Sequence, residues 1–357
     1  MNKNRIGNAF RILVILVAGM VSLCNSAFAS EGGHGEGKFN AGEMIMGHVG
    51  DAHDWHIATW KGEHITIPLP IIIYDEAKGL SVFMSGKFHH GIVDDRYKLE
   101  GNSIVAVDAE GNVDEEASAG LWDLSITKNT AALFVSLILL LVIFFNIAGA
   151  YRKRKGAAPK GLQSLIEPII IFVRDDIAKS SIGEKKYEKF MPYLLTVFFF
   201  IWINNLMGLI PIAPFGANLT GSIEVTMTLA LITFVITTIN GNSHYWRHVL
   251  AMPGVPVAIL PILTLIEVMG LFLKPFVLMV RLFANITAGH IIVLSFFALI
   301  FIFGEKGAAA GFGTGVFSLI FTIFMSMLEL LVAFIQAYVF TLLSAIYFSM
   351  AVEEEHH

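Results

Sequence analysis

Apolar residues gather in five long stretches in the last two thirds of the chain. The hydrocarbon core of a bilayer is about 30 Å thick, and a helix of about 20 apolar residues crosses it. The stretches cover residues 131–149, 192–210, 223–240, 257–303 and 316–350. This pattern predicts an all-α polytopic membrane protein with about five transmembrane helices.

The fourth stretch, 257–303, is too long for one upright crossing. A helix of about 47 residues would measure about 70 Å. Two antiparallel crossings would need a turn, but no polar turn cluster interrupts the stretch. We therefore expect one strongly tilted or bent helix, hinged near Pro261 or Pro275, and a second long tilted helix over 316–350.

Residues 161–179 have apolar side chains at helical spacing but are too polar to cross a membrane. Their apolar positions form one stripe: Leu162, Leu165, Ile166, Ile169, Val173 and Ile177. Such a stripe beside charged residues is typical of an amphipathic helix that lies along the interface. Between the third and fourth stretches we expect only a loop, which carries His244, Arg247 and His248.

The placement of basic residues predicts the orientation of the chain. Residues 1–29 have the pattern of a signal peptide: basic positions, an apolar run over 12–23, and the small residues Ala27 and Ala29 at a cleavage site. A first transmembrane helix is the alternative. The basic cluster 152–155 follows the first stretch and belongs in the cytoplasm. We expect a protein of the bacterial inner membrane, with a periplasmic N-terminus and a cytoplasmic C-terminus.

The segment before the first stretch is acidic and water-compatible. Seventeen acidic and six basic residues lie between Ser30 and Thr127, so no basic face exists to bind nucleic acid. Residues 65–68, 81–84 and 103–107 read as short strands, with a turn at Gly111 and Asn112. The sequence predicts a small β-rich or partly ordered segment over 30–124, ahead of a membrane domain over 125–357.

A dense group of histidines and aspartates in this segment raises the question of a metal. Its members are His48, Asp51, His53, Asp54 and His56. Such side chains can ligate metals, but a solvated acidic stretch is the simpler interpretation. The single cysteine, Cys24, excludes a disulfide framework and a cysteine-based zinc site. We expect neither a cofactor nor a metal.

Charges are scarce in the apolar part, and one of them lies at an unusual depth. Only eight charged residues occur from Tyr193 to Met350. Arg281 is near the middle of the fourth stretch, where an ionised group costs from about 2.5 to more than 10 kcal/mol. Its guanidinium does not lose its proton at biological pH. Arg281 therefore needs an anion or a water-filled cavity.

Helical geometry sorts the polar neighbours of Arg281 into two faces. At 100° per residue, Glu267, Lys274 and Asn285 fall within about 40° of Arg281, and His290 points about 180° away. In the last stretch, Glu329 and Gln336 are seven positions apart and share a face.

Structural roles are the alternatives for these residues. Lys274 could pair with Glu267 or extend toward the interface, and Arg281 could pair with Glu329. We favour a proton path through His290, Glu329 and Gln336, with a carboxylate for Arg281 supplied by a partner.

Several motifs closely resemble those of the a subunit of F-type ATP synthases. They are Lys274 and Pro275 followed by Arg281–His290 (RLFANITAGH), Asn205–Pro211 (NLMGLIP), Glu329–Phe340 and Tyr347–Glu353. The similarity covers roughly residues 125–355. Some family members carry an acid at the position of His290 and a histidine at that of Glu329. This chain has the exchanged arrangement, which suggests that the two residues are in contact. Other members carry an acid at the position of Gly208.

The resemblance implies a non-catalytic, proton-translocating subunit. Arg281 would be the stator arginine that faces a ring of c subunits, and a b subunit would form the stator stalk. The outer half-channel would be lined by Asn285, His290, Glu329 and Gln336. Glu267 and Lys274 would mark the exit toward the cytoplasm. The chain has no G-x-x-x-x-G-K-[ST] loop, so we expect no direct nucleotide binding.

Two other functions remain as alternatives. A secondary transporter would bind an anionic substrate at Arg281 and would contain internal repeats, but we find no clear repeat. A purely structural membrane anchor would leave Arg281, His290 and Glu329 without a role.

Overall fold

The computed structural model describes residues 40–60, 63–76, 78–94, 96–108, 110–153, 158–210, 215–252, 255–256 and 258–353. The predicted signal peptide lies outside the described residues. The chain forms two compact units, which are described separately. The first combines the chain up to Val135 with Met207–Asn218 and Gly289–Met327. The second combines Ser136–Leu206, Leu219–Ala288 and the chain from Leu328 onward.

The front of the first unit is a small β-rich domain, as the sequence predicted. Its strands are β1 (Asp54–Trp60), β2 (Glu63–Pro68), β3 (Pro70–Asp75), β4 (Gly79–Met84), β5 (Tyr97–Glu100), β6 (Ser103–Ala106) and β7 (Leu121–Asp123). Short helices accompany them: α2 (Ala41–Val49), the 3-10 helix η1 (Ser85–His90) and α3 (Glu115–Ala119). The strands pair as β1-β2, β4-β3-β7 and β5-β6, and every pairing is antiparallel.

The three strands expected from the sequence match β2, β4 and β6, and the turn at Gly111 is also present. Gly111 has a φ of 86°, and its N–H donates to the Asp108 carbonyl over 3.1 Å. A positive φ is readily adopted by glycine.

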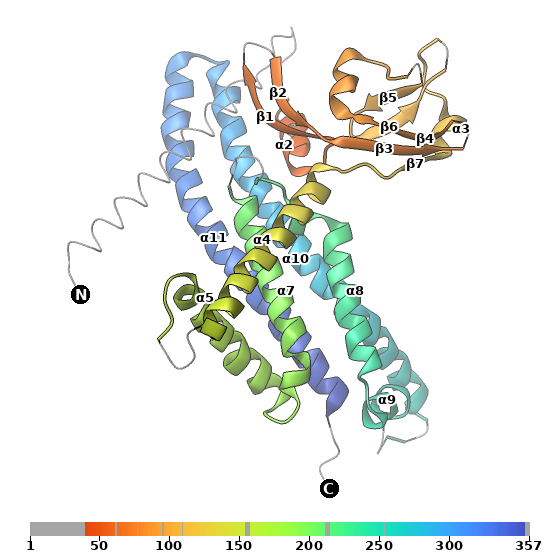
Figure 1. The fold of residues 1–357 in the computed structure, drawn as a ribbon, viewed down its shortest axis with the longest axis vertical. Coiled ribbons are helices and arrows are strands. Elements are labelled where there is room, and N and C mark those ends of the chain that lie inside the picture. Colours follow the sequence, from red (N-terminus) through yellow and green to blue (C-terminus); the bar gives the residue numbers. More distant parts are fainter. Residues whose placement is uncertain are drawn as a thin grey trace, which may run out of the picture. The chain divides into compact units, whose positions relative to one another are not determined.

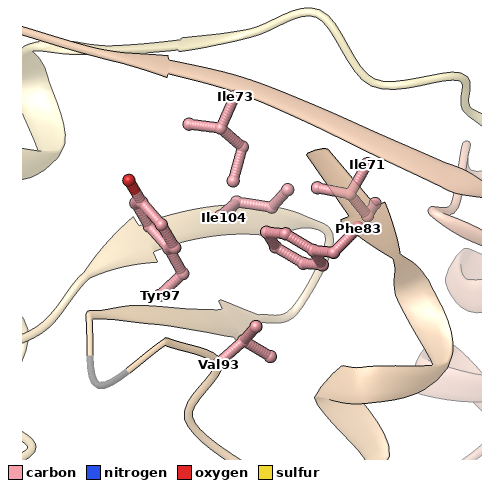
Figure 2. Packing of buried hydrophobic residues seen from close by; sticks show 6 residues of the cluster. All are labelled: Ile71, Ile73, Phe83, Val93, Tyr97 and Ile104. Atoms are coloured by element: carbon pink, nitrogen blue, oxygen red, sulfur yellow. The ribbon is translucent and has the colours of Figure 1, made fainter. Parts of the chain in front are cut away.

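The core of this domain lies between the β4-β3-β7 sheet and the β5-β6 hairpin (Figure 2). Alternate residues of β3, Ile71 and Ile73, are fully buried, because successive side chains of a strand point to opposite faces. The ring centroids of Phe83 and Tyr97 are 6.3 Å apart in this core.

A buried ion pair closes one end of the core. Arg96 donates from Nε to Asp75 Oδ2 over 2.6 Å, and the Tyr97 hydroxyl donates to the same oxygen over 3.2 Å. The hydrogen bond with Asp75 raises the pKa of the Arg96 guanidinium. Asp75 is thus buried with its charge compensated.

The front domain is joined to α4 (Lys128–Lys153) at the helix start. The Lys128 N–H donates to the Ala52 carbonyl over 2.8 Å, and the Asn129 N–H donates to Asp51 Oδ1 over 3.0 Å. These partners satisfy N–H groups that have no partner within the helix. Trp55 also belongs to a small apolar cluster with Ala132 and Ala217.

Long apolar helices form the rest of the chain, which makes it a mostly helical membrane protein. Besides α4 they are α7 (Tyr187–Gly208), α8 (Ile223–Ile239), α10 (Leu260–Gly304) and α11 (Ala308–Val352). Among the described residues, four helices are long and apolar enough to cross a membrane. A fifth crossing results if α8 and α9 (Ser243–Leu250), which are bent by 106°, form one span. The loop expected around His244 and Arg247 is therefore wrong, because these residues lie in α9.

The fourth apolar stretch is one helix of 45 residues, as its lack of polar turns predicted. Pro261 lies in the first turn of α10, where the missing N–H is tolerated. The helix also continues through Pro275 without a break. A short connection, 305–307, leads from α10 to α11 (Figure 1). In the first unit these two helices pack through Phe296 and Phe321, whose ring centroids are 4.1 Å apart.

The amphipathic stretch over 161–179 is helical, as predicted, but its backbone is not uniform. The helix α5 (Leu162–Phe172) passes into a π-helical stretch, η2 (Val173–Lys179), and then into α6 (Ser180–Ile182). Val173 and Ile177 are buried on one face. On the polar side, the hydrogen bond from Arg174 holds the pKa of Asp175 well below its usual range.

Aromatic side chains hold the second unit together. Phe190 of α7 stacks on Phe348 of α11 with ring centroids 4.7 Å apart. Phe199 of α7 meets Phe144 of α4 edge to face, with centroids 5.0 Å apart. Rings packed in this way add to the free energy gained from their burial.

Candidate functional site

Arg281 lies on an outward face of α10. Its neighbours Leu278 and Leu282 are buried, whereas Arg281 is exposed together with Ala284, Asn285 and Ala288. Asn285 shares the face of Arg281, as the helical spacing predicted. The two alanines leave the surface beside the guanidinium flat.

Within the described residues, no carboxylate forms an ion pair with Arg281. The sequence alternative of an Arg281–Glu329 pair is thus not observed there. A permanent cation halfway along an apolar helix is costly unless an anion or water compensates it. The exposed face of α10 is consequently suited to a partner that brings a negative charge to the guanidinium.

Glu267 and Lys274 lie on α10 beside a small cavity in the second unit. The cavity has a volume of about 10 Å³, close to the space that one water molecule requires. Its lining comes from four helices and is listed here: Ala230, Thr233, Phe234, Thr237, Tyr245, Leu271, Lys274, Pro275, Leu278 and Tyr347. The Lys274 ammonium lies 5.8 Å from the centre of the Tyr347 ring, a cation–π contact.

Glu267 is half-buried, and no ion pair with Lys274 within 4.0 Å is found among the described residues. The two groups still interact electrostatically, and Glu267 interacts in the same way with Tyr245. Lys274 and Tyr245 therefore line a cavity with room for water, and the Glu267 carboxylate interacts electrostatically with both of them.

The walls of this cavity contain hydroxyl groups that sequence reasoning missed. The Tyr193 hydroxyl of α7 lies 2.7 Å from Thr233 Oγ1 of α8, and Thr233 Oγ1 lies 3.5 Å from Ser344 Oγ of α11. Thr233 and Thr237, four residues apart in α8, are both buried. The recurrence of threonine at this spacing in α8 was the available signal.

His290 belongs to the first unit and lies opposite the end of α7. A Cβ atom added to Gly208 would lie 3.7 Å from His290 Nε2 and 3.4 Å from the Ala217 carbonyl oxygen. A side chain larger than a methyl group at position 208 would therefore press against the imidazole. His290 also interacts electrostatically with Lys128.

Other polar atoms of the first unit are buried without a hydrogen-bond partner among the described residues. Among them are both side-chain polar atoms of Asn218 and the hydroxyls of Ser318 and Thr322. Buried polar atoms in proteins are nearly always bonded, often to ordered water. Asn218 follows Ala217, whose carbonyl borders Gly208, whereas Ser318 and Thr322 are one turn apart on α11. Sequence reasoning did not single out the two hydroxyls.

Glu329 and Gln336 lie on α11 in the second unit. Glu329 is half-buried and Gln336 is buried. Between them along α11, the Ala333 carbonyl accepts a hydrogen bond from Asn205 Nδ2 over 3.1 Å. The Thr220 hydroxyl in turn donates to Asn205 Oδ1 over 2.5 Å. Asn205, the first residue of one recognised motif, therefore links α7 to the helix of Glu329. The contact expected between His290 and Glu329 remains a prediction.

One member of the histidine and aspartate group in the front segment pairs with a residue outside that group. His53 is buried, and its Nε2 lies 2.8 Å from Asp123 Oδ2. Among the described residues no group of three potential ligands could hold a metal ion. The side chains of His48 and His56 lie outside that description. His53 thus fastens β7 to the segment before β1.

Two family models match parts of the chain. A family model described as ATP synthase A chain matches residues 132–349. A second model, described only as a domain of unknown function, matches residues 44–124.

Individual relatives extend the comparison. The ATP synthase subunit a of Chloroherpeton thalassium is 43% identical over 244 residues, which cover 67% of this chain and 70% of the relative. That of Chlorobium phaeobacteroides is 37% identical over 334 residues, which cover 92% of this chain and 80% of the relative. That of Myxococcus xanthus is 42% identical, with coverages of 67% and 76%.

Proposed function

The chain belongs to the ATP synthase A chain family, and we propose that it is the stator subunit that passes protons to and from a ring of c subunits through two offset half-channels. The observation that carries this proposal is the exposed guanidinium of Arg281 on α10, which has no ion-pair partner among the described residues. A carboxylate on the facing subunit supplies the missing negative charge.

Arg281 determines which form of that carboxylate is favoured next to it. A fixed positive charge stabilises the ionised carboxyl group and disfavours the protonated one. A protonated group that approaches Arg281 therefore releases its proton, and an ionised group is held at the guanidinium. The flat surface at Ala284 and Ala288 allows the facing subunit to come close and to slide past.

Protons enter from the outer side through His290 and the buried polar atoms of the first unit. Water bound to Asn218, Ser318 and Thr322 connects the outside with the imidazole. The imidazole can pass a proton on, because one of its ring nitrogens accepts a proton while the other donates one. Glu329, Gln336 and Asn285 continue the path to the ring carboxylate. The neutralised carboxyl group then leaves the polar face and turns through lipid.

Protons leave through the cavity beside Glu267 and Lys274. Glu267 accepts the proton released at Arg281, and the hydroxyls of Tyr245, Thr237 and Thr233 hold water along the way. Because the two paths meet only through the rotating carboxylate, no direct leak occurs. Each proton that crosses 100 mV releases about 2.3 kcal/mol, which drives rotation.

The orientation and the partners belong to the same proposal. Arg152 and Lys153 form the last turn of α4, and the positive-inside rule assigns this end to the cytoplasm. The front domain is then periplasmic and the C-terminus cytoplasmic, in a bacterial inner membrane. A b subunit completes the stator.

Replacing Arg281 tests the proposal directly. Arg281→Ala should abolish proton-driven ATP synthesis in membrane vesicles, while the c ring still co-purifies with the chain. Lys306→Ala, which removes an exposed positive charge from the connection after α10, should leave synthesis unchanged. Normal synthesis in the Arg281 variant would overturn the proposed role.

A further inference from the structure

The β4-β3-β7 sheet of the front domain carries apolar side chains on both faces. One face forms the core already described. The other consists of three rows that run across the sheet and the chain after it: Leu80, Tyr74 and Trp122; Val82, Ile72 and Leu124; Met84, Pro70 and Ile126.

The strand register establishes these rows. Tyr74 pairs with Leu80 on one side and with Trp122 on the other. Beyond the end of β7 the pairing continues, because the Leu124 N–H donates to the Ile72 carbonyl over 2.8 Å and the Ile126 N–H donates to the Pro70 carbonyl over 3.0 Å. The segment between β7 and α4 is thus part of the sheet edge.

This second face, which we call the apolar sheet face, is open in the chain. Trp122 is 65% exposed, Leu80 64%, Val82 63% and Leu124 60%. An antiparallel sheet with a face in water normally places polar residues there. None of the nine residues is charged, and exposed apolar patches of this kind mark contacts with proteins or membranes.

The connection between the sheet and α4 indicates what covers the apolar sheet face. Ile126 is two residues from Lys128, the first residue of α4, and the start of α4 is fixed by hydrogen bonds to Asp51 and Ala52. The row that ends at Ile126 is therefore held next to the point where the chain enters the bilayer. On α4 itself, the apolar side chain of Phe134 is exposed.

The distribution of aromatic and acidic side chains favours lipid in the same way. Trp122 and Tyr74 are of the types enriched where membranes meet water. Four exposed acids lie around β6 and α3 instead: Asp108, Glu110, Glu115 and Glu116. None of them belongs to the apolar sheet face.

We propose that the apolar sheet face lies in the interfacial layer of the leaflet from which α4 begins. The front domain then rests on lipid through Leu80, Val82 and Trp122. This inference depends on the membrane embedding of α4 and not on the path of protons.

Spin-label accessibility tests the inference in the assembled complex. A Cys24→Ser background receives a single nitroxide at Val82→Cys, and the complex is reconstituted in phosphatidylcholine vesicles. Collision with oxygen, which is enriched in lipid, should be frequent at position 82, and collision with a water-soluble nickel chelate should be rare. The matched control, Glu110→Cys, should show the reverse.

Two results would overturn the inference. Free access of the nickel chelate to position 82, equal to that at position 110, would show that the face is in water. Protection from both oxygen and the chelate would show that a protein covers it. A second label at Leu80→Cys, in the neighbouring row, should give the same result if the label at position 82 has not disturbed the sheet locally. Protease resistance of the front domain verifies that each variant is folded.

Discussion

Gly208 at the end of α7 faces the imidazole of His290, and a Cβ atom at this position would lie 3.7 Å from Nε2. Two residues that are far apart in the sequence thus define one wall of the proposed outer half-channel.

Enlarging residue 208 should obstruct the approach to His290. Gly208→Ala adds a methyl group at ordinary van der Waals distances, so proton flow should be nearly unchanged. Gly208→Leu must displace the imidazole and should lower proton flow at least tenfold, measured by quenching of a pH-sensitive dye in vesicles. Gly149→Leu is the control, because open space surrounds Gly149 of α4. Equal flow in both leucine variants would contradict the assignment.

Removing the buried hydroxyl of Thr322 should remove a water-binding group from the proposed outer half-channel. Thr322→Val keeps the shape of the side chain but removes an atom that has no partner among the described residues. We expect slower proton uptake with unchanged assembly, and a larger effect when Ser318→Ala is added. Ser295→Ala is the matched control, since the Ser295 hydroxyl already donates to the Ile291 carbonyl over 2.7 Å. If the control slows uptake as much as Thr322→Val, the hydroxyl of Thr322 has no special role.

Exchanging His290 and Glu329 tests their predicted contact. Each single change, His290→Glu or Glu329→His, places two like groups in the path and should reduce ATP synthesis strongly. The double exchange restores one imidazole and one carboxylate and should recover more activity than either single variant. The interaction between the two residues is measured by the difference between the effect of the double exchange and the sum of the effects of the two single changes. A double variant no better than the weaker single variant would show that the two residues act separately.

The ion pair between His53 and Asp123 should make the stability of the front domain pH-dependent. Burial opposes ionisation of Asp123, but hydrogen bonds from His53 and Ser125 outweigh it and lower the pKa of Asp123 to about 2. A depressed carboxyl pKa stabilises the fold above the unfolded value of about 3.9, and this contribution is lost as the pH falls through about 2.

Asp123→Asn, which cannot ionise at this position, tests the pH dependence of stability. The variant should unfold more readily than the parent at neutral pH, followed by tryptophan fluorescence of the full chain in denaturant. The difference should shrink between pH 4 and pH 2. Asp94→Asn, at an exposed position, should change neither quantity. A difference for Asp123→Asn that persists at the lowest pH would rule out the ionised carboxylate as its origin.

The membrane helices were predictable because their apolar stretches are long and continuous. The expected range 131–149 lies within α4, and the absence of turn residues correctly predicted one helix over 257–303. The start of α11 was placed too late. Ala308 begins the helix well before residue 316, since the glycines and alanines there carry no clear apolar signal.

Features that depend on distant contacts escaped prediction. The π-helical stretch η2 and the sharp bend between α8 and α9 leave no mark in helical periodicity. Strands β3 and β7 pair across 50 residues of sequence, and the short run Leu121–Asp123 has no pattern of its own. In the candidate site, Arg281 and Asn285 were recognisable by depth and spacing. The structure was needed to recognise Asn218, Ser318 and Thr322, because what distinguishes them is that their buried polar atoms have no hydrogen-bond partner among the described residues.

The cap on α4 has a consequence for how the protein is made. The hydrogen-bond acceptors for the first N–H groups of the helix come from Asp51 and Ala52, which are synthesised some 75 residues earlier. The starting residue of the helix is therefore set by the front domain and not by α4 alone. A chimera that exchanges the front domains of two relatives should therefore be joined inside α4, so that each cap travels with the helix start it was built for.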